Sequence, residues 1–108
     1  MSVRMKFYRN GDGNLQVESA PASTGIGRFL IEDVQGSPAA CREILMIIEG
    51  IYRDEMASWR RVGNAHTLIL SKNEAVVESL FASPGEQCRL SLEDFREIIT
   101  NWLHFLEG

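Results

Sequence analysis

The sequence has no run of apolar residues long enough to cross a membrane, because a transmembrane helix needs about 20 of them in succession. Residues 1–20 contain Arg4, Lys6, Arg9 and Asp12 and no apolar stretch, so no signal peptide is expected either. We therefore expect a cytoplasmic protein that has no membrane partner.

Cysteine is also scarce. Cys41 and Cys88 are the two cysteines, and they form no CxxC pair. A disulfide between them would need an oxidising compartment, which the absence of a signal peptide argues against. Both have apolar neighbours in the sequence, so we expect two reduced and largely buried thiols.

Motifs that carry chemistry are missing from the sequence. It has no metal-ligand spacing and no GxSxG, HExxH or P-loop pattern, and Gly25-Ile26-Gly27 lacks the third glycine of a nucleotide-binding loop. His66 and His104 are the two histidines, and nothing in the local sequence brings them together for acid–base chemistry. We expect no catalytic residue, no metal and no cofactor. A small enzyme that uses both histidines, such as a nuclease, is the third hypothesis considered.

Basic residues are fewer than acidic ones. Eleven Lys and Arg against fifteen Asp and Glu give a net charge of −4, which disfavours direct binding to nucleic acid. Residues 62–108 hold three basic and seven acidic groups. An acidic surface of this kind would complement a basic partner, although the solvated faces of any soluble domain carry similar charge.

The patterns that are present indicate one domain over residues 1–108. Alternation over residues 3–9 predicts a half-buried strand, and the Asn10–Asn14 tract predicts a turn into a return strand at Leu15 and Val17. A third strand is predicted at Arg28–Glu32.

The second half predicts a helix, further strands and a final helix. Ser37 and Pro38 suit a helix start, and apolar residues then recur at offsets of three and four until near Ser58. Ser91 and Asp94 resemble a capping box before the last helix. The strands expected between these helices cover residues 65–70, 75–81 and 88–90.

These elements predict an α+β fold with two layers, an antiparallel sheet with two helices packed on one face, in the order β-β-(β)-α-β-β-(β)-α. The other face of the sheet would be left to water, a partner or a homodimer. Its expected residues are Arg4, Lys6, Tyr8, Gln16 and Glu18, with His66 as a further candidate.

Trp59-Arg60-Arg61, followed by Gly63, is the most distinctive local string. Trp59 is expected to close the core at a corner between helix and strand. An exposed Trp–Arg hot spot for a protein partner is the alternative, and the roles of Arg60 and Arg61 stay open.

Two resemblances extend these predictions. Ser58–Gly63, Thr67-Leu68 and Glu74 resemble the corresponding segment of the small bacterial YacL-like family, and Leu90–Phe95 resembles the start of that family's last helix. The compact α+β pattern also resembles immunity proteins of bacterial contact-dependent growth inhibition systems. These are small cytoplasmic proteins that bind and block a toxin domain, often a nuclease.

The leading hypothesis that follows is an immunity protein, not an enzyme, that neutralises the C-terminal domain of a cognate toxin by covering its active site. The second hypothesis is a YacL-like regulatory or scaffolding domain without catalysis. The contact residues proposed for the toxin, chosen on charge alone, are Glu32, Asp33, Asp54, Glu55, Glu74, Glu78 and Glu86.

Overall fold

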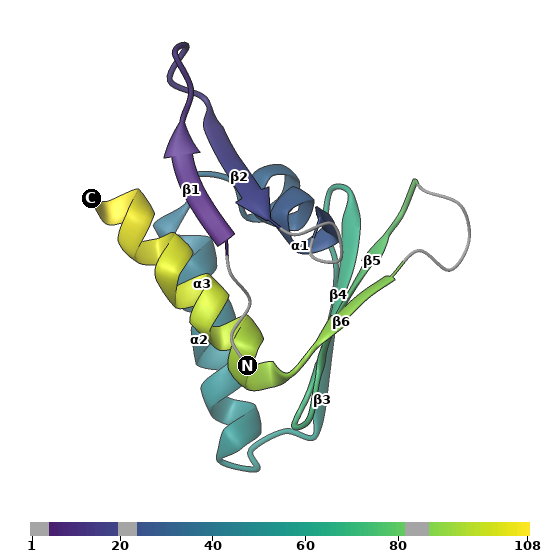
Figure 1. Ribbon diagram of the computed structural model, residues 1–108. Coiled ribbons are helices and arrows are strands. Elements are labelled where there is room, and N and C mark those ends of the chain that lie inside the picture. Colours follow the sequence, from purple (N-terminus) through teal and green to yellow (C-terminus); the bar gives the residue numbers. More distant parts are fainter. Residues whose placement is uncertain (1–4, 20–23, 82–86) are drawn as a thin grey trace.

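The computed structural model describes residues 5–19, 24–81 and 87–108, and it has an α+β architecture with antiparallel sheets (Figure 1). The predicted fold class is thereby confirmed. The elements in chain order are β1 (Met5–Arg9), β2 (Leu15–Ser19), α1 (Thr24–Phe29), the π-helical segment η2 (Leu30–Val34), α2 (Pro38–Tyr52), β3 (Ser58–Val62), β4 (His66–Ser71), β5 (Ala75–Ser79), β6 (Gln87–Leu90) and α3 (Leu92–Glu107).

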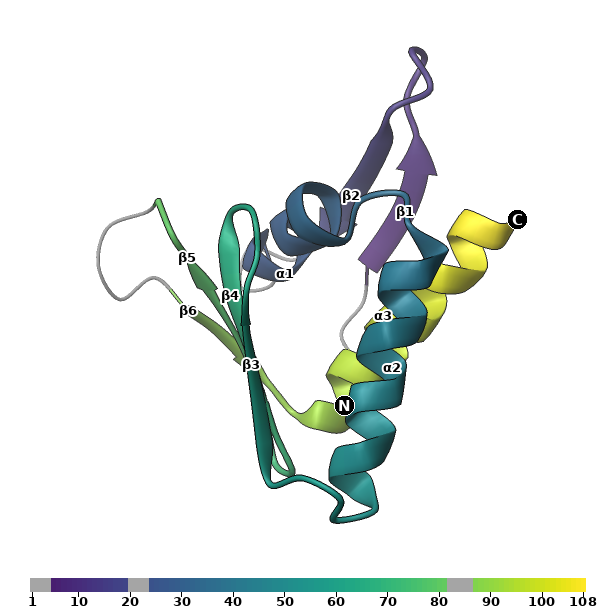
Figure 2. The same ribbon diagram turned by 180° about the vertical axis from the view of Figure 1, so that it is seen from behind.

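The strands form two sheets, where one was expected. β1 and β2 make a separate antiparallel hairpin, and the other four strands form a sheet in the order β3-β4-β5-β6. Helix α1 lies between the two sheets and contacts β2, β5 and β6 (Figures 1 and 2). The polar face predicted for a single sheet is therefore divided: Lys6, Tyr8, Gln16 and Glu18 belong to the hairpin, and Arg4 lies outside the described residues.

The third strand predicted at Arg28–Glu32 is wrong, because this segment is helical. Together with Ile26 and Val34 on either side, the buried residues Phe29 and Leu30 recur at the spacing of a helix face. The Gln35 amide donates to the Leu30 carbonyl, five residues earlier, at 2.6 Å, as in a π-helix. The buried residues of α1 and η2 are Ile26, Gly27, Phe29, Leu30 and Val34.

Helix α2 starts as predicted and ends early. The Ser37 hydroxyl accepts a hydrogen bond from the Ala40 amide at 3.1 Å, and Pro38 is the first helical residue. The helix ends at Tyr52, before the predicted end near Ser58, and Asp54 then adopts a φ of +60°. Strand β3 then begins at Ser58, so Trp59 lies in a strand rather than at a corner.

The core lies between the helices and one face of the four-stranded sheet. Helices α2 and α3 pack side by side (Figure 2), and Trp102 of α3 is fully buried. Its indole N–H donates to the Gln35 carbonyl at 2.9 Å, which ties α3 to the end of η2. The buried residues that the sheet and α2 contribute include Ile44, Ile48, Ile51, Leu68, Leu70, Ala75 and Val77.

Candidate functional site

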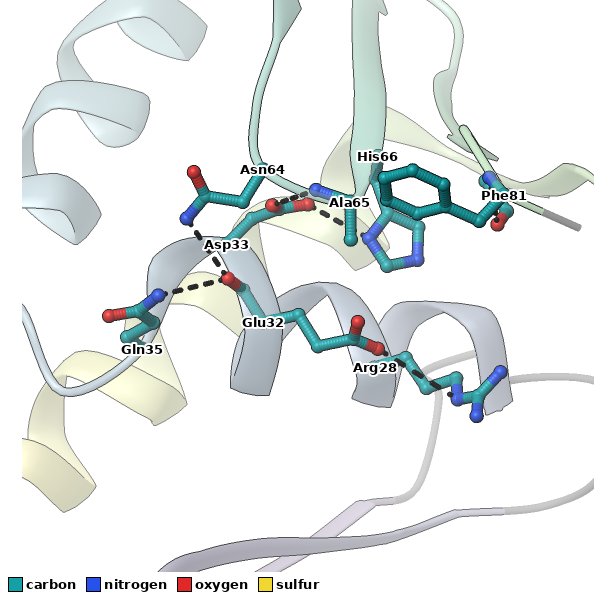
Figure 3. A network of polar contacts seen from close by, with 9 residues as sticks. Arg28, Glu32, Asp33, Gln35, Asn64, Ala65, His66 and Phe81 are labelled. Carbon is teal, nitrogen blue, oxygen red and sulfur yellow. Dashed lines mark hydrogen bonds and ion pairs between the residues drawn. The ribbon is translucent and has the colours of Figure 1, made fainter.

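A buried acid–imidazole pair joins η2 to β4. Asp33 lies in η2 and His66 is the first residue of β4, and their side chains are only 6% and 5% exposed. The His66 Nδ1–H donates to Asp33 Oδ2 at 2.8 Å, and the Ala65 amide donates to Asp33 Oδ1, also at 2.8 Å (Figure 3). One carboxylate therefore holds the hairpin between β3 and β4 against η2.

The hairpin between β3 and β4 fits closely around this carboxylate. The Gly63 amide donates to the His66 carbonyl at 2.8 Å, and a Cβ on Gly63 would lie 3.1 Å from Asp33 Oδ1. The Asn64 side-chain amide donates to the Glu32 carbonyl at 3.3 Å (Figure 3). Any side chain at position 63 would have to displace the carboxylate.

A cavity of about 340 Å³ adjoins the pair, between β3, β4 and the first turns of α2. We call it the β3 cavity. Its volume falls within the range of small-molecule and side-chain pockets. The polar residues around it are Asp33, Arg61, Asn64 and His66, and its apolar wall consists of Phe29, Val34, Ala40, Ile44, Trp59 and Leu68.

Exposed apolar side chains gather at the same end of the sheet. A second cavity, of about 260 Å³, shares His66 with the first and is also lined by Ser79 and Phe81. Phe81 is 81% exposed, and Val62, at the rim of the β3 cavity, is 56% exposed. Leu80, which is 42% exposed, is held here by its amide, which donates to the Ala65 carbonyl at 2.9 Å.

The placement of His66 on the outward face of the sheet, considered from the sequence, is wrong. His66, Leu68 and Leu70 alternate along β4 and share the side that faces the helices, since Leu68 and Leu70 belong to the core. His104, by contrast, is exposed on α3 and lines neither cavity.

The Asp33–His66 pair resembles the acid and the base of a catalytic triad, and Ser79 of β5 lies opposite His66 in the sheet register. A general base, however, must reach the proton of a substrate, directly or through one water. The imidazole is almost completely enclosed, and one of its nitrogens is engaged by Asp33. The geometry therefore favours a structural role, in which the pair fixes the hairpin that forms one wall of the β3 cavity.

Most of the acidic residues predicted as toxin contacts are buried or paired within the described part of the chain. The Asp33 side chain is buried, so it cannot contribute to a surface, and Glu86 lies outside the described residues. Glu55 is exposed near the end of α2. The remaining residues pair with groups of this chain: Glu32 with Arg28 at 3.9 Å, Asp54 with Lys72 at 2.6 Å, Glu74 with Arg89 at 2.8 Å, and Glu78 with the Gln87 side-chain amide.

The two cysteines are not linked to each other, and neither lines the β3 cavity. Burial raises the pKa of the Cys41 thiol to about 11 and also raises the pKa of Cys88. Raised pKa values disfavour the thiolate that a nucleophile or a metal ligand needs. Within residues 5–19, 24–81 and 87–108, no three His, Cys, Asp or Glu side chains are grouped as metal ligands would be. No helix of that same portion is long and apolar enough to span a membrane.

No local sequence pattern indicated the Asp33–His66 contact. The two residues come from different elements and are far apart in the chain, and Asp33 was expected at the surface on the ground of its charge alone. The string around Trp59 was recognised as distinctive. Its placement beside a cavity depends on the early end of α2, which the apolar periodicity did not reveal.

Comparison with known proteins finds one family and several relatives. Residues 4–89 match the family described as "Uncharacterised protein family (UPF0231)". The chain is similar to a UPF0231 protein of Shewanella amazonensis, with 26% identity over 96% of this chain and 97% of the relative. A UPF0231 protein of Shewanella baltica is 28% identical over 76% of this chain and 78% of the relative.

A UPF0231 protein of Erwinia tasmaniensis is 27% identical over 71% of this chain, and the match spans 63% of that relative's length. No solved structure matches the chain significantly. The recognition of an immunity protein of contact-dependent growth inhibition systems is therefore wrong, because the family that matches is UPF0231 and the comparisons indicate no immunity family.

Proposed function

This chain belongs to UPF0231, an uncharacterised protein family that supplies no activity, and from that premise we propose that it works by binding another protein rather than by catalysis. The proposed contact region is the end of the four-stranded sheet that carries the β3 cavity.

One observation carries this proposal. The described residues include four large apolar side chains that are exposed. Three of them, Val62, Leu80 and Phe81, lie at this end of the sheet. Val62 lines one cavity and Phe81 the other, and both cavities meet at His66. Exposed apolar residues that gather around cavities are typical of surfaces that become covered by a partner.

The chemistry of the site supports binding over reaction. Its two buried ionisable groups, Asp33 and His66, are satisfied by each other and by the Ala65 amide. The aromatic ring of Trp59 and the guanidinium of Arg61 are the side-chain types that contribute most energy at protein interfaces, and both line the β3 cavity.

The narrower hypothesis of a toxin inhibitor has no supporting contact or comparison, since most of its acidic residues are paired within the chain. We therefore limit the proposal to the broader class, which also includes a regulatory or scaffolding domain.

Site-specific photo-crosslinking in a bacterium that carries the gene would test this proposal. A photoreactive amino acid would replace Val62, and a matched variant would carry it at Met46, which is 74% exposed on α2 and does not line the β3 cavity. We expect a protein adduct of defined mass from position 62 and none from position 46. Equal or absent adducts at the two positions would refute the proposal.

A further inference from the structure

Strand β3 is an edge of its sheet with open backbone groups. It pairs only with β4 among the described residues. The Gly63 amide donates to the His66 carbonyl, and in an antiparallel ladder the residues that bond the neighbouring strand alternate. With Trp59 opposite Leu70 and Arg61 opposite Leu68, the backbone groups of Trp59 and Arg61 point toward β4. Those of Ser58, Arg60 and Val62 therefore point away from the sheet.

The side chains of β3 also alternate, and they point in turn to the two faces of the sheet. Trp59 and Arg61 lie on the side of the β3 cavity, whereas Arg60 lies on the opposite face of the sheet. Arg61 is paired with Glu43 of α2 at 2.8 Å. Arg60 is exposed and has no ion pair within the described part of the chain. The open edge thus combines an unneutralised cation with an adjacent cavity that has an apolar wall.

We infer that β3 is the docking edge for an extended acidic segment of a protein partner, which adds to the sheet as a further strand. Its backbone would bond the outward groups at Ser58, Arg60 and Val62. Its acidic side chains would lie beside Arg60, and the alternate apolar ones would lie over the β3 cavity. This inference rests on the proposed function and names the chemistry of the partner.

The charge on β3 disfavours a second copy of this chain as the occupant. An antiparallel pair of β3 strands centred on Arg60 would place two arginines directly opposite each other, which is destabilising. The opposite edge, β6, offers a weaker site for an acidic segment, because Arg89 is already paired with Glu74 at 2.8 Å. The charges therefore favour β3 over β6 as the docking edge. They also favour an acidic segment over a second copy of this chain as its occupant.

Two synthetic octapeptides would test this inference on the purified chain. One alternates valine with glutamate, and the other alternates valine with lysine. We expect the glutamate peptide to bind and to slow hydrogen exchange at the amides of Ser58, Arg60 and Val62 at least tenfold. The lysine peptide should leave these amides unchanged. Equal binding of both peptides, or protection at β6 in place of β3, would overturn the inference.

Variants at Arg60 distinguish the contribution of the backbone hydrogen bond to peptide binding from the contribution of the side-chain charge. R60P removes one outward N–H and keeps the ladder with β4, since proline is tolerated on the open side of an edge strand. We expect R60P to weaken binding of the glutamate peptide more than tenfold. R60D keeps the N–H and reverses the charge, so it should lose the glutamate peptide and bind the lysine peptide even if R60P fails to fold. R89A, which removes a cation from the opposite edge, is the control and should bind as the parent chain does.

The outcomes also distinguish the inference from the proposed function. If the adduct at position 62 persists in R60P and R60D cells, a partner binds but not by strand addition, and only the inference falls. If no adduct forms and no peptide binds, both fall. A parent chain that is dimeric in sedimentation, and that becomes monomeric as R60P, would show that β3 pairs with a second copy and would overturn the acidic partner.

Discussion

The Asp33 carboxylate accepts hydrogen bonds from two groups of the same hairpin, the Ala65 amide and the His66 ring. Truncation to alanine would leave both donors without a partner in a buried place. We expect D33A to lower the free energy of unfolding by about 3 kcal/mol, because each unsatisfied buried donor costs about 1–3 kcal/mol. Urea denaturation would measure this loss.

D33N is the matched variant for that measurement. An asparagine keeps an oxygen for the Ala65 amide, and its side-chain N–H₂ can donate to a His66 ring nitrogen in the other tautomer. We expect D33N to cost about 1 kcal/mol, well below D33A. Equal losses in the two variants would indicate that the hydrogen bonds contribute little and that the charge alone holds the hairpin.

Cys41 offers a second prediction at a single residue. Its side chain is 0% exposed, and burial raises its pKa from 9.0 to about 11. At pH 8 its thiolate fraction is then about a hundredfold below that of an exposed cysteine. We expect iodoacetamide to modify Cys41 at pH 8 only when urea unfolds the chain, as followed by mass spectrometry of the peptide that contains it. Comparable modification rates with and without urea would contradict the buried position.

At the scale of elements, two glycines that look alike in the sequence have opposite roles. Gly50 lies in α2, where an added Cβ would meet the flexible end of Met56 at 3.4 Å, an ordinary contact. Gly63 lies in the hairpin, where a Cβ would come within 3.1 Å of Asp33 Oδ1. Helix propensity favours alanine over glycine by about 1 kcal/mol.

We therefore expect G50A to raise the free energy of unfolding by up to about 1 kcal/mol. G63A should lower it by about 2 kcal/mol, because the carboxylate that anchors the hairpin must move. Thermal unfolding of both variants beside the parent chain would give the two signs directly. A destabilised G50A would mean that Met56 cannot shift within its packing.

Individual helices and strands differ in how well the sequence predicts them. Helix starts with a clear chemical cause were predicted correctly: the Ser91 hydroxyl does accept from the Asp94 amide, at 3.0 Å. Arg28–Glu32 was misassigned because three consecutive apolar residues fit a buried strand as well as a helix. The deciding residues, Ile26 and Val34, lie outside that window.

The candidate site was less predictable than the fold. Asp33 and His66 were both considered, one as a surface charge and the other as a residue of an open sheet face. Their contact joins two distant elements, and no local pattern records such a pairing. The open edge of β3 was hidden for a different reason: its strand is short and mostly polar, and Trp59 was expected at a corner between helix and strand.

At the scale of the whole molecule, aromatic side chains join the N-terminal hairpin to the rest of the chain. Phe7 of β1 meets the Trp102 ring edge-on, with the ring centroids 4.9 Å apart, and also contacts Phe105. An isolated two-stranded hairpin is marginally stable in water. The order of β1 and β2 therefore depends on their packing against α1 and α3.

We accordingly expect F7A to release the hairpin while the larger sheet stays folded. Loss of a partly buried aromatic side chain should cost about 2 kcal/mol locally, and hydrogen exchange should accelerate at Met5–Ser19 but not at β4 and β5. Y8A, at the next residue on the other face of β1, is the control and should keep the protection of the hairpin. If F7A instead accelerates exchange equally in both sheets, the molecule unfolds as one cooperative unit, and the hairpin is as integral to its stability as the strands that surround the β3 cavity.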